Sequence, residues 1–580
     1  MDPLLIQAYL TSLDTPSDHV TQEQCLLAIL TAITTGHGSL LTLVQGLEQV
    51  LTSEHKEQRA KGIKLMATVL GRLDPVWVPA AAVRFLVNFF CERLSDTTCV
   101  PWLVEGLQNL FQSPKFDDEH AEQVTRALLE NIHVQSFQQT TRYNILRLTL
   151  QLLEKYGSIL RTKYPTLVDG FVQAMDGEKD PRNLMLCFRA FSIVAETFDV
   201  NDQAEDMFEL VFCYFPITFR PPPGDTLGIT AEDLKLALRK CLTATPAFGP
   251  YAIDLFLTKL SSSSGTAKLD TLQTLTQCFR VYRMVDIEPH LSELVTSIGD
   301  VISQTTDESV NAEAQRALTT LFSRLAQALP PKEALTTEPY PALRQVLDQF
   351  VAQLRDNDLQ PAVRTCRVLR AVAISSTYNA LMVSRHVLPI LLTRADECAT
   401  VADKGHILEI MYNLFKGCSR DTLSLVADLD QTEWDSFWRT YTDKTFLFLT
   451  SAVATLVGQD QRTALKACSA LAAALAVPSL FLLDEKRAAM SVIQDTYYAV
   501  NPSLQPLLSD VMVQLARAEP DVVREVTELY LENHLPLFTN TGDFDRADLL
   551  PTFTLLQELG AIPALTRPYI QVLVAHLPTR

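Results

Sequence analysis

The sequence predicts an all-α fold in which antiparallel helix pairs stack one after another into a solenoid. Three observations support this prediction. One helix-face spacing of apolar residues recurs along the chain, and the recurrences are about 40 residues apart. Strand signals are almost absent, because there is neither sustained alternation of apolar and polar residues nor an Asn-Gly hairpin turn. At 580 residues the chain is also too long for a single hydrophobic core.

The recurring pattern places apolar or small residues at relative positions 0, 4, 7, 8 and 11, which covers one face of a helix and part of a second. The first copies begin 39 to 42 residues apart, and later gaps are wider where loops are inserted. This period is typical of HEAT or armadillo units, of which about 12 to 14 would fill the chain. The copies begin at Gly62, Leu103, Ile145, Leu184, Leu234, Val310, Ile407 and Ala464.

Turn chemistry predicts where individual helices begin. Asp180 is expected to cap the next helix with Pro181 at its first position, where a missing N–H costs nothing. Thr230 is expected to cap a helix whose first turn holds Glu232 and Asp233, which the helix dipole favours. Further breaks are expected at Pro75, Pro79, Pro114, Pro246 and Pro331.

Composition and charge favour a folded protein that does not bind nucleic acid. Hydrophobic residues make up 47% of the chain and charged residues 20%. The formal charge of -19 repels phosphate backbones overall. A local basic helix face remains at Arg364, Arg367 and Arg370, which we interpret as a solvated face.

The N-terminal segment and the cysteines indicate a compartment. The first residues include Asp2 and no basic region, so we expect no secretory signal, and no apolar run reaches the length of a membrane span. The 11 cysteines are scattered and no pair has the CxxC spacing of a zinc or iron–sulfur site. Reduced thiols in a cytosolic or nuclear protein are the simplest account.

No catalytic motif was found. The chain has no GxGxxG, GxxxxGK[ST], GxSxG or HExxH, and its ten histidines lack metal-ligand spacing. A Cys–His pair formed through space stays open, but nothing singles one out. We therefore expect no enzyme, no cofactor and no metal. Trp434 and Trp438 lie at i and i+4, where core packing and an exposed binding anchor are both open interpretations.

Three segments carry a resemblance to a known family. They are YPTLVDGFVQAMDGEKDPRNL (Tyr164 to Leu184), CYFPITFRPPPGDTLGITAEDL (Cys213 to Leu234) and AKLDTLQTL (Ala267 to Leu275). Together they closely resemble the N-terminal region of the methyl-methanesulfonate-sensitivity HEAT-repeat family. On this basis residues 1–420 are expected to form the N-terminal HEAT-repeat domain of the family, and residues 421–580 to continue with HEAT-like repeats without a clear boundary.

The resemblance implies a function that periodicity alone does not. Family members are non-catalytic adaptors of the cytosolic iron–sulfur protein assembly targeting complex, which also contains a small carrier-like subunit and a β-propeller subunit. They recruit apo iron–sulfur client proteins for cluster insertion, including a transcription factor IIH helicase, DNA polymerases and primase. The resemblance thus implies a protein of the cytoplasm and nucleus, linked through its clients to nucleotide excision repair, DNA repair and transcription.

The chain departs from the family in length. Family members are roughly twice as long, and their C-terminal repeats dock the propeller and carrier subunits. We therefore expect either an N-terminal fragment or a divergent short form, which would keep client-side surfaces and lack the main dock.

Candidate binding residues lie in two of the resembling segments. In the first, they are Asp176, Glu178 and Lys179 in an inter-helix turn, and Arg182 at the start of the next helix; Asp180 and Arg182 also fit a bridge between neighbouring repeats. In the second, a proline-rich loop that favours extended backbone is either a partner-binding element or a cover over apolar side chains. Its candidates are Tyr214, Phe219, Arg220, Pro221, Pro222 and Pro223.

Two other functions fit a long acidic helical array. A nuclear transport receptor would bind basic cargo and a small GTPase, and a generic HEAT-repeat scaffold would have no tie to iron–sulfur clients. An adaptor should co-purify with iron–sulfur enzymes, whereas a transport receptor should bind the GTPase in its GTP form.

Overall fold

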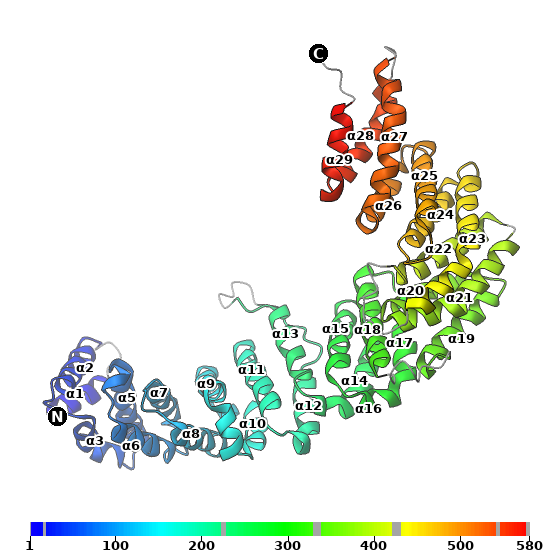
Figure 1. Cartoon of the computed structure of the whole chain (residues 1–580). Helices are drawn as coiled ribbons and strands as arrows, with labels where there is room; N and C mark the ends of the chain where they lie inside the picture. The colour runs from blue at the N-terminus through cyan, green and yellow to red at the C-terminus, as the bar shows by residue number, and fades with distance from the viewer. Residues whose placement is uncertain are drawn as a thin grey trace. The chain divides into compact units, whose positions relative to one another are not determined.

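The computed structural model describes residues 2–14, 19–221, 228–328, 338–398, 400–419, 431–540 and 546–575. It divides into two compact units, Met1–Ala252 with Val281–Arg283, and Ile253–Arg280 with Met284–Arg580. Each unit consists of helices, and no described residue lies in a β-strand (Figure 1). The predicted all-α class and the HEAT/armadillo-like solenoid are confirmed. The predicted division at residue 420 falls within 420–430, outside the described residues, and stays a prediction.

The first unit begins with short helices and continues as regular pairs. Its α-helices are α1 (Pro3–Ser12), α2 (His19–Thr34), α3 (Leu40–Gly46), α4 (Glu48–Leu51), α5 (Lys56–Arg72), α6 (Ala80–Cys91), α7 (Val100–Phe111), α8 (Asp118–Asn131), α9 (Gln139–Lys163), α10 (Leu167–Met175), α11 (Pro181–Thr197), α12 (Ala204–Phe212) and α13 (Ala231–Leu242).

The boundary between the two units lies within α14 (Gly249–Ser262), so the second unit begins in this helix. Its further α-helices are α15 (Gly265–Val281), α16 (Met284–Ile287), α17 (Leu291–Gln304), α18 (Glu308–Gln327), α19 (Pro341–Arg355), α20 (Gln360–Ile374), α21 (Thr377–Glu397), α22 (Val401–Gly417), α23 (Gln431–Leu456), α24 (Gln461–Leu475), α25 (Leu483–Ala499), α26 (Gln505–Ala518), α27 (Pro520–Asn540), α28 (Arg546–Gly560) and α29 (Pro563–Ala575).

Within each unit the helices form two layers. In the first unit α5, α7, α9, α11 and α13 contact one another in sequence, and α6, α8, α10 and α12 form the second row (Figure 1). In the second unit one row consists of α18, α20, α22, α24, α26 and α28. The other row consists of α17, α19, α21, α23, α25, α27 and α29. The predicted repeat starts lie on α5, α7, α9, α11 and α13 in the first unit and on α18, α22 and α24 in the second. One pair cannot bury both of its apolar faces alone, so stacking completes the core.

The predicted helix starts at Asp180 and Thr230 are confirmed. The Asp180 carboxylate accepts from the backbone N–H of Arg182 at 3.0 Å, with Pro181 in the first position of α11. Thr230 and Asp233 exchange hydrogen bonds in a capping box, with Asp233 N–H to Thr230 Oγ1 at 3.1 Å and Thr230 N–H to Asp233 Oδ2 at 2.9 Å. Pro331 lies outside the described residues.

Tyrosine hydroxyls connect neighbouring repeats at a spacing of 40 residues. Three of them donate to a backbone carbonyl one repeat earlier: Tyr156 to Phe116 at 2.9 Å, Tyr282 to Leu242 at 2.6 Å, and Tyr378 to Glu338 at 3.1 Å. The sequence shows the tyrosines, but not that each hydroxyl reaches a backbone carbonyl of the preceding repeat. These bonds reinforce the repeat period at the junctions.

Tyr156→Phe should therefore lower the free energy of unfolding of its junction by about 1 kcal/mol, because the Phe116 carbonyl loses its buried donor. Hydrogen exchange across residues 110–160 measures this change. Tyr143→Phe on the same helix is the control and should change the free energy by less than about 0.5 kcal/mol. Equal effects of the two variants would rule out a structural role for the hydroxyl bond.

The tryptophan pair belongs to the core. Trp434 and Trp438 are 4% and 0% exposed, and their ring centroids are 5.7 Å apart. The Trp434 indole N–H donates to the Pro478 carbonyl at 3.0 Å. The core-packing interpretation is confirmed and the exposed-anchor interpretation is wrong.

Among the described residues, no helix is long and apolar enough to cross a membrane, and no group of three or more His, Cys, Asp or Glu side chains is arranged to hold a metal ion. Nine of the cysteines are buried, Cys398 is half-buried and Cys213 is exposed. Burial raises the pKa of the Cys241 and Cys418 thiols to about 12.

Candidate functional site

The turn between α10 and α11 is built around a buried glutamate. Gly177 has φ +75°, a left-handed conformation that glycine adopts without strain, and it reverses the chain after α10. The reversal leaves Asp176 and Lys179 exposed and directs the Glu178 side chain inward, where it is 0% exposed. The charges of Asp176 and Lys179 are therefore exposed to solvent, whereas the Glu178 carboxylate is buried.

The Glu178 carboxylate is held by donors from three places. Arg142 of α9 donates through Nε to Oε2 at 2.8 Å and through Nη2 to Oε1 at 3.0 Å. The backbone N–H groups of Lys179 and Asp180 donate to Oε1 at 2.8 and 2.9 Å, and Asn183 Nδ2 donates to Oε2 at 2.9 Å. A buried carboxylate needs several such donors to stay charged, and this site supplies five hydrogen bonds.

The pKa of Glu178 reflects this competition. Burial alone would raise it, but the Arg142 guanidinium and the hydrogen bonds from Asp180, Asn183 and Lys179 outweigh burial and hold the pKa below its usual range. The carboxylate is thus ionised at neutral pH. Arg142 also donates to the Phe137 carbonyl at 2.9 Å, so one side chain ties α9 to its own loop and to the next repeat.

This bridge between repeats has a counterpart earlier in the chain. Arg59 of α5 forms an ion pair with Asp96 at 2.7 Å and donates to the Ser53 carbonyl at 2.7 Å. Each arginine lies in the first turns of its helix and reaches an acidic residue in the following repeat, 37 residues later for Asp96 and 36 for Glu178. An arginine followed by an acidic residue nearly one repeat later is a pattern that can be recognised in the sequence, but it was not among the features used to predict the site.

Asp180 and Arg182 lie beside this bridge. Their side chains pair with each other through Arg182 Nη2 and Asp180 Oδ2 at 3.1 Å, while Asp180 also caps α11. Burial opposes ionisation of Asp180, but the donors of Arg182 and Asn183 hold its pKa below the usual value. Asp180 therefore has a structural role in starting the helix, and Arg182 remains half-buried at the edge of the turn.

The proline-rich loop is anchored on the same turn. Tyr214, just after α12, donates its hydroxyl to the Glu178 carbonyl at 2.9 Å, and its ring packs edge-on against Phe188 with centroids 5.7 Å apart. Phe215 is 5% exposed, stacks on Phe212, and precedes Pro216 through a cis peptide bond. Two segments that the sequence singled out separately thus form one junction.

The predicted binding residues differ in their exposure to solvent. Asp176, Lys179, Arg220 and Pro221 are exposed, whereas Tyr214, Phe219 and Arg182 are half-buried. Pro222 and Pro223 lie outside the described residues. Glu178 is a correction: its carboxylate is enclosed by its donors, so it shapes the surface without reaching a partner. The start of the loop, at Tyr214 and Phe215, covers apolar side chains, and the stretch at Arg220 and Pro221 is presented to solvent.

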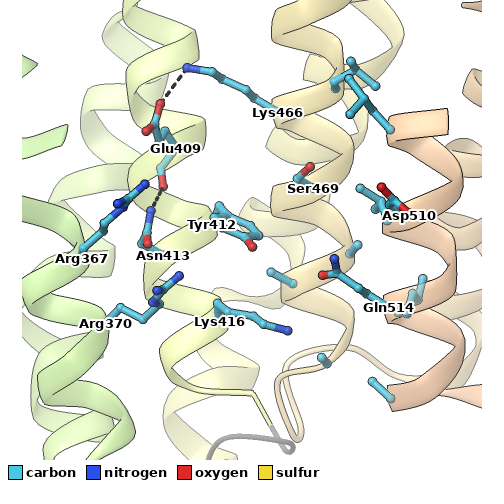
Figure 2. Close-up of a pocket in the computed structure, with 18 of the residues that line it drawn as sticks. Arg367, Arg370, Glu409, Tyr412, Asn413, Lys416, Lys466, Ser469, Asp510 and Gln514 are labelled. Atoms are coloured by element: carbon cyan, nitrogen blue, oxygen red, sulfur yellow. Dashed lines mark hydrogen bonds and ion pairs between the residues drawn. The ribbon is translucent and has the colours of Figure 1, made fainter. Parts of the chain in front are cut away.

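A second candidate surface lies in the second unit, where the sequence analysis expected only a solvated helix face. A groove of about 630 Å³ runs across the neighbouring helices α18, α20, α22, α24 and α26. Figure 2 shows charged and polar side chains of α20 and α22 on one side, and small side chains of α24 and residues of α26 on the other.

Two of the charges in this groove are neutralised by partners. Arg367 Nη1 lies 3.4 Å from Glu308 Oε1, and Lys466 Nζ lies 2.7 Å from Glu409 Oε2. Arg370 differs, because its hydrogen bond runs from Nη2 to the amide oxygen of Gln315 at 2.6 Å. Burial lowers the pKa of Arg370, and the positive charge of Arg367 lowers it further. Of the three arginines at this spacing, Arg364 is exposed, whereas Arg367 and Arg370 are half-buried.

Residues 44–304 match the family described as Dos2-interacting transcription regulator of RNA-Pol-II. A human protein called MMS19 nucleotide excision repair protein homolog is 30% identical over 390 residues, which are 66% of this chain and 37% of that protein. The chain belongs to the MMS19 family. This is the family that the three resembling segments indicated, and all three lie within residues 44–304.

Other MMS19 relatives extend the comparison. The mouse MMS19 homolog is 28% identical over 569 residues, 94% of this chain and 53% of that protein. The fission yeast relative, called DNA repair/transcription protein mms19, is 29% identical over 378 residues, 65% of this chain and 36% of that protein. The chain thus spans about a third to a half of the length of these relatives. The names of these relatives describe them as nucleotide excision repair and DNA repair/transcription proteins.

Solved structures with a similar course of the chain are helical repeat proteins of low sequence identity. Kap121p gives a TM-score of 0.36 at 10% identity over 100% of this MMS19-family chain and 68% of that structure. Importin beta gives 0.38 at 11% identity over 99% of this chain and 79% of that structure.

Proposed function

We propose that this chain is a non-catalytic adaptor of the cytosolic iron–sulfur protein assembly machinery, which recruits apo iron–sulfur client proteins for cluster insertion. The observation that carries the proposal is membership of the MMS19 family, in a match over residues 44–304 that includes all three resembling segments. The clients in this proposal are DNA repair, replication and transcription enzymes: the transcription factor IIH helicase, DNA polymerases and primase. Their work would explain the repair and transcription names of the relatives.

The architecture supports a binding function. Solenoids offer long surfaces on a rigid frame, and their loops can vary without disturbing the core. At the junction of α9, α11 and α12, buried bonds around Glu178 hold the turn and the start of the loop at Tyr214 in place, so that Asp176 and Lys179 project from a fixed turn, and Arg220 and Pro221 are exposed further along the loop. Preorganised side chains lose less entropy when a partner binds. We propose this exposed set as a client-binding surface.

The adaptor would act in both cytoplasm and nucleus, because clusters are assembled in the cytosol and the clients work on DNA. The matched residues are only 37% of the human and 53% of the mouse relative, so these relatives have additional length on which the propeller and carrier subunits could dock. We therefore propose that residues 1–580 carry client contacts, and that those two subunits bind mainly through repeats that the relatives have in addition.

Affinity purification with mass spectrometry from the chain's own cells tests this function. We expect enrichment of iron–sulfur DNA enzymes with little of the propeller subunit. Replacing Arg220 and Pro221 to Pro223 by a Gly/Ser linker should reduce client recovery about tenfold or more, because charged and rigid contacts dominate small interfaces.

Arg84→Ser is the matched control, because Arg84 is an exposed arginine of the same unit on α6. It should leave client recovery unchanged. Equal recovery by the linker variant would move the binding site away from this loop. Enrichment of a small GTPase and nuclear-pore proteins instead of iron–sulfur enzymes would contradict the adaptor proposal and favour a transport receptor.

A further inference from the structure

The groove of the second unit contains an arginine whose hydrogen-bonding capacity is largely unused. A guanidinium carries five N–H donors, and Arg370 uses one of them on the Gln315 amide oxygen at 2.6 Å. Within the described part of the chain, no carboxylate lies within ion-pair distance of Arg370. Its side chain is half-buried beside Arg367, which is already paired with Glu308. A positive charge in this position is stabilised by an acceptor that enters from outside.

The shape of the groove leaves room for that acceptor. Ser469, Ala472 and Ala473 of α24 and Ala476 just after it are small, so this part of the lining leaves space in front of α22, while Leu465 and Lys466 of α24 also line the groove. Figure 2 shows Arg370, Tyr412 and Lys416 on the α20 and α22 side, facing Gln514 and Asp510 of α26 across this space. A volume of about 630 Å³ accommodates several side chains of a peptide, and is within the range of specific ligand sites.

The far side of the groove adds apolar surface. Leu507 of α26 lines it and is 54% exposed, so its side chain is available for an apolar contact. Val511 continues this surface one turn further along α26, where it is half-buried. A ligand that fits therefore combines a negative group for Arg370 with an apolar group for Leu507 and Val511.

We propose that this groove binds an extended segment of a partner protein in which an aspartate or glutamate lies close to an apolar residue. The carboxylate accepts two parallel N–H bonds from Arg370, and the apolar side chain packs against Leu507 and Val511. This binding site lies in a different unit from the turn and loop at Glu178 and does not depend on the iron–sulfur proposal. It assigns a defined peptide chemistry to a part of the chain beyond residues 44–304.

A carboxylate in the groove can be used to test whether the ligand is acidic. Asp510 on α26 is exposed and lines the same space. A like charge at this position weakens binding of an acidic segment. Removing it should therefore strengthen binding, whereas removing Arg370 should weaken it, and general loss of structure cannot produce these opposite changes.

The test selects random 12-residue peptides from a display library on the full chain of residues 1–580. We expect the selected peptides to be enriched in an acidic residue near an apolar one. A fluorescent synthetic copy of the most enriched peptide is then titrated by anisotropy. Arg370→Gln should weaken its binding about tenfold or more, the range expected for losing hydrogen bonds between charged groups, and Asp510→Asn should strengthen it about two- to fivefold.

Two further variants keep the test decisive. Arg364→Gln, on the exposed face of the same helix, should bind the peptide as the wild type does. Arg370→Lys keeps the charge but loses the parallel bonds, so its affinity should fall between those of wild type and Arg370→Gln. Selected peptides without acidic residues, or equal affinity for wild type and Arg370→Gln, would overturn the proposal.

Discussion

Replacing Arg142 by alanine is expected to destabilise the junction between α9 and α11 by about 3–5 kcal/mol. The reason is the Glu178 carboxylate, which is 0% exposed and would lose the guanidinium that bonds both of its oxygens. A buried pair adds little net stability over apolar residues, but removing one member leaves an uncompensated charge in the interior. The loop at Tyr214 should loosen as well, because its hydroxyl bonds the Glu178 carbonyl.

Hydrogen exchange at residues 137–184 measures this loss, since repeat proteins open locally. The pH dependence gives an independent check. The pKa of Glu178 is lowered in the folded state, so its contribution to stability is full above the unfolded pKa of about 4.3 and is lost as the pH falls through the folded value. The difference between wild type and Arg142→Ala should therefore be largest at neutral pH and should shrink as the pH falls below about 4.3.

A double variant is the matched control for this prediction. Arg142→Met with Glu178→Met removes both charges and should be less destabilised than Arg142→Ala alone. If the single variant were as stable as wild type at pH 7, Glu178 would not be the charged centre of the junction.

Leu184→Asp is expected to cost several kcal/mol, more than the about 2–5 kcal/mol of a buried leucine-to-alanine change. Leu184 is 8% exposed on α11, which stacks between α9 and α13. An aspartate there is a charge without a partner between stacked helices. Because a solenoid is held by contacts between neighbouring repeats, the loss of structure should spread from α11 and leave distant repeats folded.

Hydrogen exchange resolved along the chain checks this local pattern. Gln173→Asp introduces the same residue at an exposed position of α10 and should change protection by less than about 0.5 kcal/mol. Uniform loss of protection over the whole chain after Leu184→Asp would contradict the array of semi-independent repeats.

The helices were predictable because their signals are local. The apolar spacing that starts at Leu184 has the period of one helix face, and Asp180 and Thr230 cap their helices through bonds to residues two or three positions away. No long-range information is needed for such features. The period near 40 then follows from repetition of the same unit.

The candidate site was only partly predictable, because its decisive contacts join distant residues. Glu178 looks like a solvated turn residue until Arg142, 36 positions earlier, is known to reach it. Tyr214 looks like part of a loop surface, yet its hydroxyl returns to Glu178. Neither pairing follows from one of these residues alone. The two arginine–acid pairs, Arg59 with Asp96 and Arg142 with Glu178, have nearly the same separation, and this repetition can be recognised in the sequence.

The groove illustrates the same limit on a larger scale. Arg364, Arg367 and Arg370 are equally spaced on one helix, and spacing alone suggests equal exposure. Their surroundings differ because helices α18 to α26, which span more than 200 residues of sequence, enclose Arg370 and leave Arg364 in solvent. Only the stacked arrangement of repeats distinguishes the three side chains.

As an adaptor, this chain would bind apo iron–sulfur enzymes. The most direct measurement is the affinity of the purified chain for the purified transcription factor IIH helicase of the same organism, prepared without its cluster, beside a helicase that has no cluster site. The adaptor proposal predicts saturable binding of the apo iron–sulfur helicase and at least about tenfold weaker binding of the other, which corresponds to about 1.4 kcal/mol. Equal affinity for both, or no binding of either, would contradict it.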